Sequence, residues 1–155
     1  MKIWIDADAC PRPVKEMVFK ASTRLKVPVC LVANSYLQPP RGFPYVSSVQ
    51  VERGPDVADE HIVDQVKPED MVITADIPLA ALVVQKGAVG LNPRGELYTE
   101  ENVRERLSMR DFMMGLRETG VLEGGGPPPF GPKDKSRFAS SFDSAITKML
   151  RNERP

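Results

Sequence analysis

The sequence predicts an α/β fold with a mainly parallel central sheet and helices on both of its faces. Short apolar segments alternate along the chain with longer segments of helical periodicity, an order that produces parallel strands joined by helices. Segments such as MVITA (71–75) are apolar almost throughout, which is typical of strands covered on both faces. With 155 residues, the chain is expected to form a single domain, 1–155, around one core.

The first half of the chain supplies three expected strands and two expected helices. Apolar runs predict strands at 2–6 and 29–33, and YVSSVQV predicts another at 45–51. A helix is expected at 12–25, with Pro11 and Pro13 near its start, and a second at 56–66.

The second half continues the alternation of strands and helices. Strands are expected at 71–75 and 88–91, and helices at 79–86, 100–118 and 137–150. Thr99 is placed to cap the helix at 100–118, and Gly120 to end it. The last helix presents apolar residues along one face, namely Phe138, Phe142, Ile146 and Met149.

A segment rich in glycine and proline interrupts this order before the last helix. GGGPPPFGPKDK (124–135) contains four prolines, a composition that favours neither a helix nor a central strand. We therefore expect a loop at 122–135. A loop of this length in a compact domain is usually functional or disordered.

Charge and cysteine content exclude several classes of protein. The 21 basic and 21 acidic residues balance, so the whole molecule has no net field to attract nucleic acid or an anionic membrane. The charge is nevertheless unevenly distributed along the chain, because residues 52–76 are strongly acidic. The charged N-terminus is not a secretory signal, and no apolar run is long enough to span a bilayer, so we expect a cytoplasmic protein without a membrane partner. Cys10 and Cys30 form neither a disulfide framework nor a zinc motif, and we expect both to pack as small apolar residues.

Acidic residues end two of the predicted strands. Asp6 closes KIWID and Asp76 follows MVITA. The carboxyl ends of parallel strands share one edge of the sheet, where ligands bind in open α/β folds. Asp8 is expected to point the same way as Asp6 if the extended backbone continues. The alternative for Asp6 alone is a structural role at a helix N-terminus.

A third carboxylate lies on the apolar face of the middle helix. At 100° per residue, Asp59 falls in the centre of the stripe formed by Ile62, Val63 and Val66, whereas Asp64 falls on the solvated side. An ionised carboxylate there must be paired, protonated or given a cation. The simplest alternatives are an arginine partner and a hydrogen bond from a backbone amide. Taken with the other acids, however, Asp59 predicts a Mg²⁺ site, because Mg²⁺ prefers oxygen ligands and relieves repulsion between carboxylates.

Five stretches resemble the bacterial YaiI/YqxD family, which is similar to PIN-like nuclease domains. They are WIDADACPRPVK, GPDVADEHIVDQV, VITADIPLAALVVQKGA, LNPRGELYT and GGPPPFGPKDKSRFASSFD. The resemblance implies a PIN-like three-layer α/β/α sandwich and an acidic cluster that holds Mg²⁺ or Mn²⁺. By position it implies catalytic roles for Asp6, Asp59 and Asp76. Many PIN-like enzymes have a fourth acid near the third. Here Ile77 and Pro78 follow Asp76, which leaves Asp8 or Asp56 as the fourth.

Hydrolysis of phosphodiester bonds, with RNA as the expected substrate, is therefore the leading hypothesis. The residues expected to bind phosphate are Arg12, Lys15, Lys133, Lys135 and Arg137. The alternative for these residues is ordinary solvated charge. Phe130 could stack a base or anchor the loop.

Two other functions are compatible with the same residues. A non-catalytic PIN-like module would bind RNA or protein through this pocket without turnover. A phosphatase of the haloacid dehalogenase type would use Asp6 as nucleophile and Asp8 as acid/base, but ADIPLA lacks the paired aspartates of that family's later motif.

Overall fold

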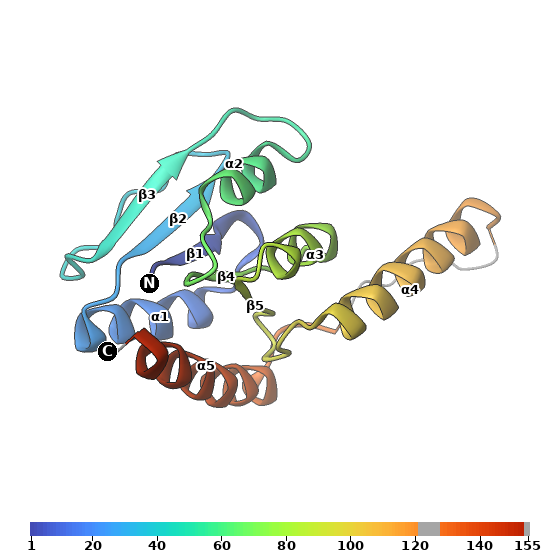
Figure 1. Ribbon diagram of the computed structural model, residues 1–155. Helices are drawn as coiled ribbons and strands as arrows, with labels where there is room; N and C mark the ends of the chain where they lie inside the picture. Colours follow the sequence, from blue (N-terminus) through green and yellow to red (C-terminus); the bar gives the residue numbers. More distant parts are fainter. Residues whose placement is uncertain (121–127, 154–155) are drawn as a thin grey trace.

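The computed structural model describes residues 1–120 and 128–153, and it has the predicted architecture (Figure 1). Five strands form the central sheet, namely β1 (Ile3–Asp6), β2 (Val29–Ala33), β3 (Val46–Gln50), β4 (Met71–Ile73) and β5 (Val89–Leu91). The helices are α1 (Arg12–Leu25), α2 (Val57–Gln65), α3 (Ile77–Gln85), α4 (Glu100–Glu118) and α5 (Pro132–Glu153), with a short 3₁₀ helix, η1 (Ala7–Ala9). None of the helices in the described residues combines the length and apolar composition needed to cross a bilayer.

The sheet is parallel throughout, with strand order β3-β2-β1-β4-β5. The chain builds β1 to β3 in one direction and then returns to add β4 and β5 on the other side of β1. The order therefore reverses between β1 and β4, and a crevice at such a reversal is where open α/β sheets bind ligands. The register pairs Ile5 with Ile73, which places Asp6 beside Thr74 just past the carboxyl end of β4.

Helices cover both faces of the sheet and form a three-layer α/β/α sandwich. On one face α1 and α5 pack against Ile3, Ile5 and Leu31. On the other face α2 and α3 pack against Trp4, Val32 and Val72. The two sets come from alternating strand positions, which accounts for the uninterrupted apolar pattern of β1 and β2.

The fourth helix, α4, packs on α3 through Val103 and Leu107 and extends away from the body of the molecule in Figure 1. Thr99 and Asn102 form a reciprocal capping box at its start, in which the Thr99 hydroxyl accepts a hydrogen bond from the Asn102 amide. Large apolar side chains remain exposed on α4, including Met109 and Phe112.

The last helix begins earlier than the sequence indicates. We expected a loop to residue 135 and a helix at 137–150, but α5 starts at Pro132 and includes Lys133 and Lys135. Proline is favoured in the first turn of a helix, where its missing N–H has no intrahelical partner. Residues 121–127, the first part of the expected loop, lie outside the described residues.

Candidate functional site

The carboxyl edge of the sheet brings Asp6 and Asp76 into one hydrogen-bonded unit with Thr74. The Thr74 hydroxyl donates to Asp6 Oδ2 over 3.0 Å and accepts from the Asp76 backbone N–H, also over 3.0 Å. Asp6 is 8% exposed and Thr74 is 1% exposed. A single buried threonine therefore fixes the acids that end two neighbouring strands.

Asp76 is also the N-cap of α3. Its Oδ1 accepts a hydrogen bond from the Leu79 N–H over 2.9 Å, and Pro78 lies in the first turn of the helix. This contact explains why α3 begins at Ile77, two residues before the predicted start. The sequence allowed Asp6 a structural role at a helix N-terminus. In the structure Asp76 has that role through Oδ1, and its Oδ2 makes no cap contact.

Asp59, in α2, faces the same edge of the sheet. Its pKa is raised to about 7, first of all by burial. The charges of three neighbouring carboxylates act in the same direction, in decreasing order those of Asp76, Asp6 and Asp56. A hydrogen bond with Asp76 raises it further. Burial and the surrounding negative charge thus both favour the protonated form of Asp59.

Asp6 also lies in a buried and acidic environment. Burial is the largest cause that raises its pKa, and the Thr74 hydrogen bond opposes it. The charges of Asp76 and Asp8 raise the pKa further. Three carboxylates from β1, α2 and the start of α3 therefore repel one another at the reversal of the strand order.

No basic side chain within the described residues forms an ion pair with Asp59, which excludes the arginine partner there. Beside Asp59 lies a cleft of about 480 Å³ between α2 and α3. Four acidic side chains line it, Asp56, Asp59, Glu60 and Asp64. The edge of the sheet next to α2 is therefore strongly acidic.

Asp8 does not point the same way as Asp6. The backbone turns into η1 at Ala7, so the extended conformation that would have aligned the two side chains ends at Asp6. The Asp8 carboxylate instead accepts a hydrogen bond from the Asn34 N–H over 2.9 Å, beyond the end of β2. The two acids of the DxD stretch therefore have different hydrogen-bond partners, Thr74 for Asp6 and the Asn34 N–H for Asp8.

Within residues 1–120 and 128–153, no group of three or more His, Cys, Asp or Glu side chains is arranged as a metal site. The oxygen donors of Asp6, Asp59 and Asp76 are of the type that Mg²⁺ and Mn²⁺ prefer. Two of those oxygens are occupied, Asp6 Oδ2 by Thr74 and Asp76 Oδ1 by the helix cap. The arrangement thus fits an ion that contacts one or two carboxylates and keeps several waters, as Mg²⁺ does.

Both cysteines pack as apolar residues, as predicted. Cys30 is 1% exposed within β2. Burial raises the pKa of Cys10 to about 12, so its thiol stays protonated at neutral pH. A buried and protonated thiol is a poor nucleophile.

The predicted phosphate-binding residues separate into two groups. Arg12 and Lys15 lie in the first turn of α1, next to the Asp6 segment, and Arg12 forms an exposed pair with Glu16 at 3.7 Å. Lys133, Lys135 and Arg137 lie in the first two turns of α5, all exposed. Phe130 packs against the core, with the Arg94 guanidinium 5.9 Å from its ring, which favours the anchoring role.

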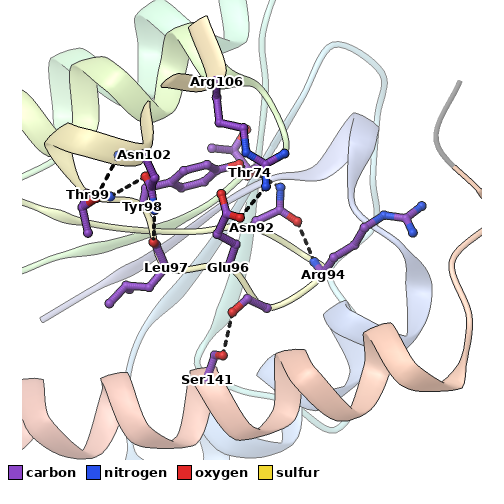
Figure 2. A network of polar contacts seen from close by, with 11 residues as sticks. Thr74, Asn92, Arg94, Glu96, Leu97, Tyr98, Thr99, Asn102, Arg106 and Ser141 are labelled. Atoms are coloured by element: carbon purple, nitrogen blue, oxygen red, sulfur yellow. Dashed lines mark hydrogen bonds and ion pairs between the residues drawn. The ribbon is translucent and has the colours of Figure 1, made fainter. Parts of the chain in front are cut away.

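A polar network that the sequence does not predict joins the turn after β5 to Thr74 (Figure 2). Tyr98 donates its hydroxyl hydrogen to the Thr74 carbonyl over 3.0 Å and accepts one from the Asn92 side-chain amide over 2.8 Å. Asn92 Oδ1 in turn accepts from the Arg94 N–H over 2.7 Å. Asn92 and Tyr98 carry no sequence pattern that marks them, because their role depends on contacts between β4 and the turn that follows β5.

The chain matches the family model described as "Uncharacterized BCR, YaiI/YqxD family" over residues 4–148. A UPF0178 protein of Geobacter sulfurreducens is 60% identical over 151 residues, which cover 97% of this chain and 99% of the relative. One from Geobacter metallireducens is 61% identical over 155 residues, 100% of this chain and 99% of the relative. A Shewanella relative is 56% identical over 150 residues, 97% of each chain. No solved structure matches the chain. With a family match over nearly its whole length, the chain belongs to the YaiI/YqxD family.

Proposed function

We propose that this protein hydrolyses phosphodiester bonds of nucleic acid, with RNA as the expected substrate, and that a divalent cation bound by Asp59 and Asp76 assists the reaction. The observation that supports this proposal is the convergence of Asp6, Asp59 and Asp76 at the reversal of the strand order. Evolved cores rarely keep three mutually repelling carboxylates without a positive partner, because each raises the cost of ionising the others.

The local chemistry favours a hydrated Mg²⁺ or Mn²⁺ ion as that partner. Asp59 and Asp76 are close enough to share a hydrogen bond, so they are the residues that would contact the ion. Asp6, fixed by Thr74 behind them, adds negative charge without needing to bind directly. A cation held there would polarise a phosphoryl oxygen and lower the pKa of a bound water.

A bound cation would also reduce the repulsion that the acidic surroundings exert on nucleic acid. Asp56, Glu60 and Asp64 line the cleft beside Asp59 and would repel a phosphate. Arg12 and Lys15 at the start of α1 provide positive charge at the same edge of the sheet. Phosphate contacts of this kind supply affinity without reading sequence.

The test is a cleavage assay with purified protein and end-labelled single-stranded RNA and DNA, in Mg²⁺, in Mn²⁺ and in EDTA. We expect cleavage only with the cations, and a loss of roughly a hundredfold in Asp59→Asn and Asp76→Asn. Asp143→Asn, which changes an exposed acid on α5, is the matched control and should cleave like wild type. Full cleavage in EDTA would rule out the cation-dependent mechanism.

A second candidate is a nucleic-acid-binding module without turnover. The observation that favours it is that the described carboxylates are not arranged as a three-ligand metal group. The same assay separates the two functions. RNA binding without cleavage across a range of Mg²⁺ and Mn²⁺ concentrations would support the binding module and reject hydrolysis.

A further inference from the structure

Thr74 joins the acidic site to β5 and the segment that follows it, because each of its polar groups has a hydrogen-bond partner. The Thr74 hydroxyl donates to Asp6 and accepts from the Asp76 N–H. The Thr74 N–H donates to the Leu91 carbonyl over 3.1 Å, and the Thr74 carbonyl accepts from the Tyr98 hydroxyl over 3.0 Å. The place of Thr74 therefore depends on β5 and on Tyr98.

Tyr98 is buried against α3, α4 and β5. It is 5% exposed and packs with Ala80 of α3 and Val103 of α4. Its N–H donates to the Gly90 carbonyl over 2.9 Å. A Cβ atom at Gly90 would lie 3.1 Å from Cδ2 of the Tyr98 ring, so the glycine leaves room for the ring beside β5. Close packing thus fixes the ring where its hydroxyl reaches Thr74.

Asn92 sets the direction in which the Tyr98 hydroxyl donates (Figure 2). The Asn92 side-chain amide donates to the Tyr98 oxygen over 2.8 Å, and its Oδ1 accepts from the Arg94 N–H over 2.7 Å. Because the Tyr98 oxygen accepts from Asn92, its own hydrogen is left for the Thr74 carbonyl. Burial raises the pKa of Tyr98, so the hydroxyl keeps this hydrogen at neutral pH.

The turn that carries Asn92 is anchored on α5. Ser141 of α5 donates to the Gly95 carbonyl over 2.6 Å (Figure 2). A Cβ atom at Gly95 would lie 2.7 Å from the Arg137 carbonyl carbon, so the turn and the helix are in close contact. The packing of α5 therefore supports the position of Asn92.

We propose that Tyr98, oriented by Asn92, is a positioning residue of the acidic site. By holding the Thr74 carbonyl, Tyr98 keeps the Thr74 hydroxyl where it binds Asp6 and the Asp76 N–H. Tyr98 acts through Thr74 alone and touches neither cation nor substrate. This inference rests on the proposed function, because the carboxylates that it positions are those proposed to hold the cation.

The first test needs no cation. Tyr98→Phe keeps the ring and removes the hydroxyl, and amide hydrogen exchange followed by NMR in EDTA reports on the Asp76 N–H. We expect the Asp76 amide to exchange faster than in wild type, by about tenfold more than the amides in the middle of β1 and β2. The reason is that its acceptor, the Thr74 hydroxyl, is held less firmly. A general loss of stability would not single out Asp76.

Val103→Ala is the matched control. It removes volume from the apolar cluster around Tyr98 and leaves the Tyr98 hydroxyl in place. It should lower the melting temperature without the selective change at Asp76. The comparison separates a positioning role of Tyr98 from its contribution to packing.

Asn92→Asp tests the hydrogen bond with the tyrosine retained. A carboxylate at this position keeps an acceptor for the Arg94 N–H but cannot donate to Tyr98. The Tyr98 hydroxyl would then donate to that carboxylate instead of to the Thr74 carbonyl. We expect the same selective exchange at Asp76 as in Tyr98→Phe.

The second test measures Mn²⁺ binding by isothermal titration calorimetry. We expect Tyr98→Phe to bind Mn²⁺ about tenfold more weakly than wild type, because polar groups behind metal ligands tune affinity by this order. Val103→Ala should bind like wild type. Equal Mn²⁺ affinities of Tyr98→Phe and wild type would overturn the inference, and so would a Tyr98→Phe variant without selective exchange at Asp76.

The two tests separate the inference from the proposed function. Selective exchange at Asp76 in a protein that binds no Mn²⁺ would keep the positioning role of Tyr98 and reject the proposed cation site. Mn²⁺ binding by wild type that Tyr98→Phe leaves unchanged would reject the inference alone.

Discussion

Asp59 holds the most informative carboxyl group of the molecule, because burial and three acidic neighbours raise its pKa to about 7. In the unfolded chain it would titrate near the ordinary value of 3.8. Below about pH 4 the residue is protonated in both states. As the pH rises toward 7, the unfolded chain releases the proton and the folded protein retains it, so stability falls across this interval.

We therefore predict that Asp59→Asn is more stable than wild type at about pH 8 in EDTA, and equally stable at about pH 4. The side chain is only partly buried, so we expect a gain of about 1–2 kcal/mol. Urea denaturation across this pH range measures the gain in unfolding free energy. Asp143→Asn is the control, and its unfolding free energy should change with pH as that of wild type does. Parallel curves for Asp59→Asn would show that the carboxylates do not interact as described.

Thr74 is the residue that joins the two strand-end acids. Thr74→Val keeps the shape but removes the donor to Asp6 and the acceptor for the Asp76 N–H. Leaving these buried groups unpaired should cost about 1–3 kcal/mol of unfolding free energy. Thr147→Val, on the exposed side of α5, should change stability by less than about 0.5 kcal/mol. Equal effects of the two substitutions would mean that the Thr74 hydroxyl has no special role.

At the scale of elements, the packing of the turn after β5 on α5 depends on Gly95. Gly95 has φ of 99°, and an added Cβ would lie 2.7–2.8 Å from the backbone and Cβ atoms of Arg137. Gly42 also has a positive φ, 86°, but nothing lies within 4 Å of its added Cβ. The two glycines therefore separate backbone strain from steric overlap.

We predict that Gly42→Ala costs about 1 kcal/mol, from the left-handed backbone alone. Gly95→Ala should cost roughly 1–3 kcal/mol more, because α5 must move away from the turn. Thermal unfolding of both variants gives the difference directly. Similar melting temperatures would indicate that the turn and α5 are not packed as closely as described.

Element positions were largely predictable because hydrophobic periodicity reports local burial. The bounds of α1, β2 and α4 match the expected ranges, and the central position of Asp59 on its helix led to the acidic site. The start of α5 was missed because a proline that ends one helix and a proline that begins another look alike in sequence.

The cleft of about 520 Å³ beside the turn after β5 could not be predicted for a different reason. Its lining comes from the turn at 92–96, from Arg106 and from 128–137, which are brought together only by the way β5, α4 and α5 pack. Each arginine alone resembles an ordinary surface charge.

At the scale of the whole molecule, the strand order of the sheet determines where the acidic site lies. The reversal between β1 and β4 brings the ends of two strands and α2 to one crevice, and the turn after β5, α4 and the start of α5 line a second cleft. The zero net charge of the molecule is therefore unevenly distributed, with acidic side chains gathered in the cleft beside Asp59 and mixed charges in the cleft beside the turn after β5.

The most direct measurement of the central claim is the anomalous difference density of a crystal soaked in Mn²⁺. We predict a peak at the reversal between β1 and β4, in contact with Asp59 or Asp76, that disappears in Asp59→Asn crystals soaked identically. Manganese bound only elsewhere on the molecule, with this crevice free of density, would contradict it.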